Sequence, residues 1–141
     1  MLDLRRILNN PRLLKALTGV PAQEFEILLL TFTRILIEIA TSKPRQRAYG
    51  GGDKSILETP ADKLFYILFY VKVYLTYDVA GAFFGAVRSA AFAWTKKFLP
   101  VLEKTLGRTV EMPKRQIHSV EEFMKAFPDI KDIFVEHAIV K

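Results

Sequence analysis

Apolar residues recur every three to four positions along most of the chain, which is the period of an amphipathic α-helix. They are densest between residues 21 and 41 and again between 59 and 75. So many positions are apolar in these two stretches that we expect two long helices, each buried on most sides. The pattern therefore predicts a compact all-α fold of about six or seven helices around one core.

Capping residues and glycines mark the ends of the predicted helices. Asn10 and Gly19 enclose a short amphipathic stretch, and residues 1–8 before it predict another short helix. Thr59 starts the second long helix, since a hydroxyl there accepts a hydrogen bond from an unpaired backbone N–H group. Ser119 opens a last short helix, which ends before Pro128.

Residues 76–97, TYDVAGAFFGAVRSAAFAWTKK, predict two short helices broken at Gly85. Ala80 and Gly81 are small enough for close helix crossing, Phe84 is an apolar anchor, and Gly85 tolerates the positive φ of a tight turn. This is the spacing of a helix-turn-helix, in which the second helix lies in the DNA major groove. A plain helical hairpin shows the same pattern, so these residues leave both interpretations open.

Composition indicates one domain with a polyanionic partner. The chain has 141 residues, of which 50% are hydrophobic and 26% charged, and its net charge is +6. Such a balance favours nucleic acid or an anionic surface as partner.

The apolar run from Phe25 to Ala40 contains Arg34 and Glu38, so we expect no membrane span. The N-terminal residues lack the pattern of a signal peptide, which predicts a cytoplasmic protein.

Residues 43–55, KPRQRAYGGGDKS, interrupt the helical pattern with a proline and three consecutive glycines. This basic linker offers Arg45, Arg47 and Lys54 to DNA phosphates. A solvated loop between helices is the alternative interpretation.

The sequence offers little that indicates catalysis. It has no cysteine and two histidines, so a zinc site lacks ligands. It has no phosphate-binding glycine motif, and no histidine is placed beside a nucleophile by any motif. We therefore expect no enzyme, no metal and no cofactor.

Five blocks follow one another in a diagnostic order: NPRLLKALTG, the basic glycine-rich linker, LETPADKLFYILFYVKVYLTYDVAGAFFG, FLPVLEKTLGR and MPKRQIHSVEEFMKAFPDIKD. Together they cover nearly the whole chain and closely resemble the N-terminal region of insertion-sequence transposases of the DDE superfamily. The resemblance implies a helix-turn-helix domain that binds double-stranded DNA at the transposon ends. In the family, an RNase H-like catalytic domain with three carboxylates and divalent metal normally follows.

This resemblance implies roles for the second helix of the 76–97 unit. Arg88, Ser89 and Phe92 would face the bases, while Lys96 and Lys97 would face phosphates. The helix departs from the family pattern, which usually has a capping Ser, Asp or Thr at its start and polar or basic residues outward. Here Val87 stands at the cap, and Phe92 and Ala93 point outward; a phenylalanine contacts a thymine methyl but forms no bidentate hydrogen bonds.

The resemblance also divides the chain. Residues 1–112 would be the helical domain, and residues 113–141 a connector, a short helix and a remnant of the first strand of a missing catalytic domain. Glu136 stands where the family has its first catalytic Asp, and the other two carboxylates have no counterpart. Phosphoryl transfer with two metal ions needs converging carboxylates, so the chain is expected to be truncated and inactive alone.

A second interpretation belongs to a different class of function. The apolar, β-prone run from Ile133 to Val140 would be an unpaired edge that invites association with another chain. The chain would then be a helical interaction module that does not bind DNA. It would associate with itself or with full-length transposase, as a dominant-negative remnant.

Overall fold

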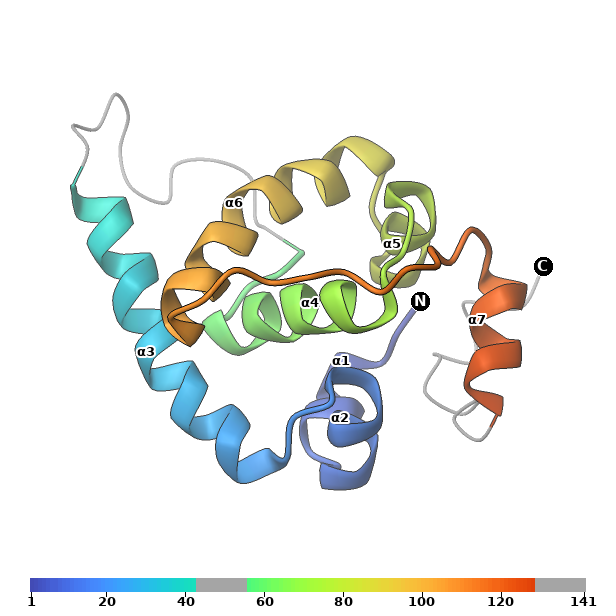
Figure 1. Ribbon diagram of the computed structural model, residues 1–141, viewed down its shortest axis with the longest axis horizontal. Coiled ribbons are helices and arrows are strands. Elements are labelled where there is room, and N and C mark those ends of the chain that lie inside the picture. The colour runs from blue at the N-terminus through green and yellow to red at the C-terminus, as the bar shows by residue number, and fades with distance from the viewer. Residues whose placement is uncertain (43–55, 129–141) are drawn as a thin grey trace.

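The computed structural model describes residues 1–42 and 56–128 of the chain (Figure 1). The described residues form seven helices: α1 (Leu4–Leu8), α2 (Pro11–Thr18), α3 (Ala22–Thr41), α4 (Pro60–Val73), α5 (Tyr77–Phe84), α6 (Arg88–Leu106) and α7 (Val120–Ala126). An isolated β bridge joins Leu75 and Ile117. The predicted all-α class is confirmed.

Helix α4 lies at the centre of the molecule (Figure 1). Helices α2, α3 and α6 all pack against α4, and α6 also contacts α3 and α5. Helix α3 runs along one edge of the molecule, α7 lies near the opposite edge, and the extended segment after α6 leads back across α4 towards α7 (Figure 1). The elements on every side of α4 explain why it forms the core.

Helix α4 begins at the predicted cap, Thr59, and its last residue is Val73. The Thr59 hydroxyl accepts from the N–H of Asp62 at 3.1 Å, and the Asp62 carboxylate accepts from the N–H of Thr59 at 3.3 Å. Every residue from 64 to 70 is buried. The sequence predicts an end at about Leu75; the helix ends at Val73, because Tyr74 adopts a left-handed φ of 62° and Leu75 pairs with Ile117.

Helix α3 occupies the predicted range, but the expected burial on most sides is wrong. Only Phe25, Phe32 and Ile35 are buried. Large apolar side chains at three other positions are exposed, namely Ile27, Leu30 and Ile37. The reason is its place at the edge of the molecule, where only one side of the helix meets other elements.

The shorter helices are fixed by local signals. The Asn10 side chain accepts from two backbone N–H groups at the start of α2, and Gly19 ends that helix in the left-handed conformation. Ser119 caps α7, whose Phe123 is fully buried against the rings of Phe69 and Phe83. The described part of residues 113–141 is therefore held against the helical core.

Two predicted features lie outside the described residues. These are the basic linker with Arg45, Arg47 and Lys54, and the apolar run from Ile133 to Val140 together with Glu136. Within residues 1–42 and 56–128, no helix combines the length and the apolarity needed to cross a membrane.

Candidate nucleic-acid interface

Helices α5 and α6 are joined by a tight turn of three residues, Gly85, Ala86 and Val87. Gly85 adopts a φ of 68°, which a residue with a side chain rarely tolerates. The N–H of Ala86 donates to the carbonyl oxygen of Gly81 at 2.8 Å, so the chain folds back onto α5 immediately. The predicted break at Gly85 is confirmed.

Gly81 makes this turn sterically possible. A Cβ atom at this position would lie 2.6 Å from the carbonyl oxygen of Ala86 and 3.2 Å from that of Val87. Both contacts are with backbone, which cannot move aside as a flexible side chain can. The small residue that the sequence places on α5 is therefore required by the close approach of the turn.

The inner side of α6 is anchored to α4 by a buried polar group. The Tyr66 hydroxyl lies 2.8 Å from Thr95 Oγ1 and donates to the carbonyl oxygen of Ala91 at 3.2 Å. The Tyr66 ring also meets Trp94 edge-on, with the ring centroids 5.3 Å apart. Burial raises the pKa of Tyr66 to about 12, so the hydroxyl stays protonated at neutral pH. This anchor fixes which side of α6 faces solvent.

All five residues of α6 that are predicted to face DNA are exposed. They are Arg88, Ser89, Phe92, Lys96 and Lys97. A spacing of four residues places Arg88, Phe92 and Lys96 in one row along the helix, and Ser89 and Lys97 lie in the neighbouring row. The helix passes through Pro100 without a break, so these rows belong to one continuous rod of 19 residues.

Phe92 is less free than the sequence suggests. Its side chain is 46% exposed, and its ring packs edge-on against Tyr77 with the centroids 5.3 Å apart. Lys96 Nζ lies 5.5 Å from the ring centroid, within reach of a cation–π contact. The ring therefore holds the Lys96 ammonium close to the surface of α6.

Helix α6 starts at an exposed residue without a capping side chain. Val87 is 68% exposed, and only its backbone carbonyl contributes, accepting from the N–H of Ala90 at 3.1 Å. The predicted absence of a polar cap is confirmed. The first turn of α6 thus presents the positive end of the helix dipole beside the Arg88 guanidinium.

Lys63 adds a cation that the sequence interpretation did not include. It lies in the first turn of α4 and is half-buried. Burial, and secondarily the positive charge of Lys97, lower the pKa of Lys63, although Asp62 opposes this effect. Two lysines from different helices therefore lie close enough to repel each other. The sequence signal was present, since Lys63 interrupts an otherwise apolar helix, but its neighbour depends on how α4 and α6 pack.

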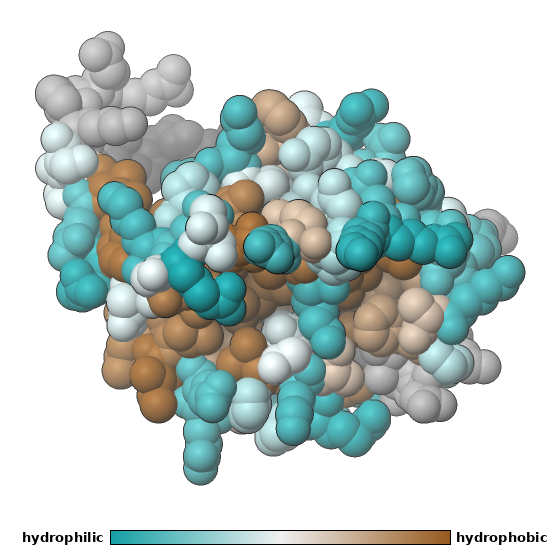
Figure 2. Space-filling model, in the orientation of Figure 1, coloured by the Kyte–Doolittle hydropathy of each residue, from teal (hydrophilic) through white to brown (hydrophobic). Residues whose placement is uncertain are grey.

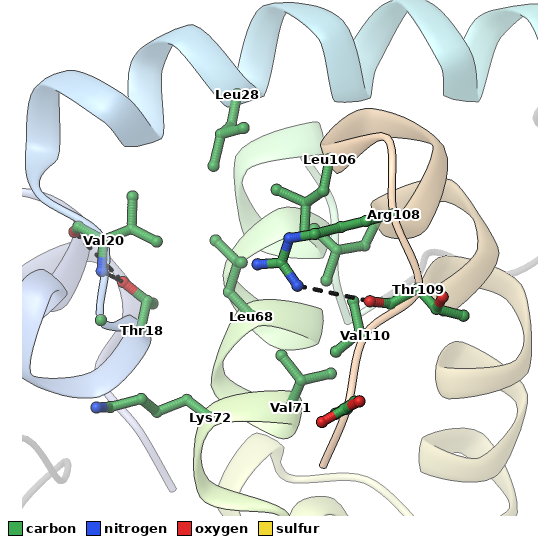
Figure 3. A pocket seen from close by; sticks show the side chains of 13 residues that line it. Thr18, Val20, Leu28, Leu68, Val71, Lys72, Leu106, Arg108, Thr109 and Val110 are labelled. Atoms are coloured by element: carbon green, nitrogen blue, oxygen red, sulfur yellow. Dashed lines mark hydrogen bonds between the residues drawn. The ribbon is translucent and has the colours of Figure 1, made fainter.

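A separate pocket of about 600 Å³ lies between the end of α2, helix α4 and the end of α6 (Figure 3). Its floor is apolar, and Figure 3 shows the Arg108 guanidinium pointing in between Leu28 and Leu68. The Arg108 guanidinium donates to the carbonyl oxygen of Thr109 at 3.5 Å.

This pocket holds no arrangement that indicates catalysis. Its Thr18 hydroxyl donates to the backbone carbonyl of Leu14 at 2.7 Å and is therefore engaged in the helix. Among the residues that the structure describes, no three metal-binding side chains gather anywhere. The exposed residues of α6 remain the better candidate site, because Arg88, Lys96 and Lys97 bring three positive charges to one helix surface.

Comparison with known proteins does not extend this picture. The chain matches no protein-family model, no curated protein and no solved structure.

Proposed function

We propose that α5, the turn and α6 form a helix-turn-helix that binds double-stranded DNA, as the resemblance to insertion-sequence transposases implies. One observation carries the proposal. Arg88, Lys96 and Lys97 lie exposed along α6, which is anchored to α4 through the buried Thr95. A helix presented in this way fits the width of the DNA major groove.

The positions along α6 assign different roles to these residues. Arg88 and Ser89 stand at the start of the helix, where residues of a recognition helix reach base edges, and Phe92 follows one turn later. Lys96 and Lys97 lie two turns along the helix and face phosphates. Lys63 joins Lys97, since a phosphate between two lysines relieves their mutual repulsion.

The proposed activity is binding to transposon ends, without strand cleavage by this chain alone and without metal or cofactor. Net charge supports binding to a polyanion, because the chain carries +6 at neutral pH. Cleavage by two metal ions would need converging carboxylates, and the resemblance matches only Glu136 of this chain to such a position.

The test is a fluorescence-anisotropy titration of the full chain against duplexes with candidate transposon ends and against scrambled duplexes. Arg88→Ala should weaken cognate binding about 10-fold or more and scrambled binding less. Lys96→Ala should weaken both equally and reduce the salt dependence of binding by about one phosphate contact. Lys104→Ala is the matched control, since Lys104 is exposed near the far end of α6.

Two outcomes would contradict the proposal. Equal losses from Arg88→Ala and Lys104→Ala would remove the recognition role of α6. Weak binding that is the same for every duplex and disappears with modest salt would leave only generic attraction to phosphates.

The rival proposal is a helical interaction module that associates with intact transposase. It rests on the run from Ile133 to Val140 and on the outward position of Phe92. That run lies outside the described residues. The exposed position of Phe92 gives the rival proposal little support, because the Phe92 ring already packs against Tyr77. Binding to DNA is therefore the function that we carry forward.

A further inference from the structure

The outer side of α3 exposes a mainly apolar stripe, which we call the α3 stripe: Ile27, Leu30, Arg34 and Ile37. The three apolar members are 64%, 75% and 58% exposed, in chain order. Figure 2 shows hydrophobic surface gathered along the edge of the molecule where α3 lies in Figure 1. An apolar stripe on a regular helix is unusual for a surface that faces only water.

The spacing of the α3 stripe is the spacing of a coiled-coil seam. Its members follow one another at intervals of three, four and three residues, which matches the a and d positions of a heptad. A surface groove on α3 has Leu30, Thr33, Arg34 and Ile37 in its lining. Residues at i, i+3, i+4 and i+7 form the four-residue hole that receives one side chain of a facing helix. The stripe is therefore shaped for another helix.

The stripe also has the same spacing in both directions along the helix. A second α3 that runs antiparallel would place its Ile37 opposite Ile27, and its Leu30 opposite Arg34. The same contacts then recur on the other side of a two-fold axis, as an isologous interface requires. In this register, Leu30 of each copy enters the hole of the other.

Charge selects the antiparallel arrangement. A parallel pair would place Arg34 against Arg34, with like charges in the seam. In the antiparallel pair, the Arg34 stem lies over Leu30 and its guanidinium comes within one helical turn of Glu26 of the second copy. Arg34 is accessible for this, since its only ion pair within the described residues is with Glu38, at 2.9 Å, and both side chains are 61% exposed.

We propose that the α3 stripe is a homodimer interface, in which two copies of this chain pair through antiparallel α3 helices. This inference goes beyond DNA binding and is tested without DNA, so either proposal can fail while the other stands.

The first experiment is sedimentation velocity of the full chain over a range of concentrations. A monomer–dimer equilibrium is expected. Leu30→Glu should raise the dimer dissociation constant at least about 100-fold, because a two-fold interface loses the apolar contact twice. The change is made at an exposed position and places Glu four residues before Arg34, so the fold is retained. Ile56→Glu, at another exposed apolar residue, is the control and should leave the equilibrium unchanged.

The second experiment uses the absence of cysteine from the chain. The double variant with Ile27→Cys and Ile37→Cys should form disulfide-linked dimers when oxidised with diamide. Each single variant should not, because its two cysteines would be about ten residues apart along the antiparallel pair, roughly 15 Å. Cross-linking of either single variant would indicate a parallel pair and overturn the proposal.

Charge reversal gives a third test. Arg34→Glu should weaken the dimer, and adding Glu26→Arg should restore it. Residues 26 and 34 are two turns apart on one helix, roughly 12 Å, so such rescue requires contact between copies. A wild-type chain that stays monomeric overturns the proposal. So does a dimer that survives Leu30→Glu but is lost on deletion of residues 129–141.

Discussion

Helices α3 and α4 are equally apolar, yet the fold buries most of α4 and only one side of α3. Helix α4 has eight buried residues, whereas α3 has three. The apolar residues of α4 surround the helix and meet other elements, whereas α3 carries apolar residues on its buried side and also on its exposed outer side. The comparison teaches that the density of apolar residues predicts a helix but does not determine how much of that helix the fold of one chain buries.

The polar groups of α4 bond within the fold, whereas those of α3 lie at the surface. Helix α4 has a capped start and a buried tyrosine hydroxyl that is bonded to α6. Helix α3 has no side-chain cap, and its ion pair between Arg34 and Glu38 is exposed. Polar contacts of α4 therefore contribute to the fold, while those of α3 remain accessible to another molecule.

The largest expected effect contrasts Phe69 of α4 with Leu30 of α3. Phe69 is fully buried, so Phe69→Ala should lower the free energy of unfolding by about 3–5 kcal/mol. Leu30→Ala should change it by less than about 0.5 kcal/mol, because Leu30 is exposed. Urea denaturation followed by circular dichroism, at low micromolar protein where copies are separate, measures both. Similar losses from the two variants would contradict the assigned burial of α3.

A second effect appears at alkaline pH and concerns Tyr66. Its folded pKa, about 12, exceeds the ordinary value of 10.0. A raised pKa means that its contribution to stability is complete below pH 10 and is lost as pH rises towards 12. Wild type should thus lose about 1 kcal/mol from this group by pH 11, while Tyr66→Phe loses nothing from it.

The same substitution removes a buried hydrogen bond and should cost about 1 kcal/mol at pH 8. The two proteins should therefore become about equally stable near pH 11. Urea denaturation at pH 8 and pH 11 tests this convergence. A constant difference across that range would show that the hydroxyl of Tyr66 is not shielded from water.

The next effect concerns the start of α4. Thr59→Ala removes the side-chain acceptor for the N–H of Asp62 and should cost about 1 kcal/mol of unfolding free energy. Thr59→Ser retains the hydroxyl and should be nearly neutral. Helix α3 has no equivalent, since Pro21 precedes it without a side-chain hydrogen bond. A loss for Thr59→Ser as large as for Thr59→Ala would assign the effect to the lost methyl group rather than to the cap.

Capping residues and a glycine explain why the sequence predicted several helix boundaries correctly. Asn10, Thr59, Ser119 and Gly85 act on backbone within a few residues, so the helix boundaries beside them follow from the sequence alone. The exposed side of α6 was also predictable, because periodicity fixes which residues share a face.

Contacts between distant residues were not predictable in the same way. Tyr66 and Thr95 are 29 positions apart, and Leu75 pairs with Ile117. The nearness of Lys63 to Lys97 likewise depends on how α4 meets α6. No periodic pattern encodes such pairings, which is why Lys63 was missed at the candidate site and the end of α4 was misplaced.

The smallest effect concerns the ion pair on α3. Arg34 and Glu38 are both 61% exposed, so water and salt weaken their attraction. A double-mutant cycle with Arg34→Ala and Glu38→Ala should give a coupling of about 0.3–0.5 kcal/mol in dilute protein at low salt, and less at high salt. Repeating the cycle at concentrations where dimers form should give a different value, because Arg34 then also lies near Glu26 of the second copy. A coupling that is unchanged by protein concentration would show that α3 meets only water on its outer side, and the contrast with α4 would then reflect a solvated helix rather than an interface.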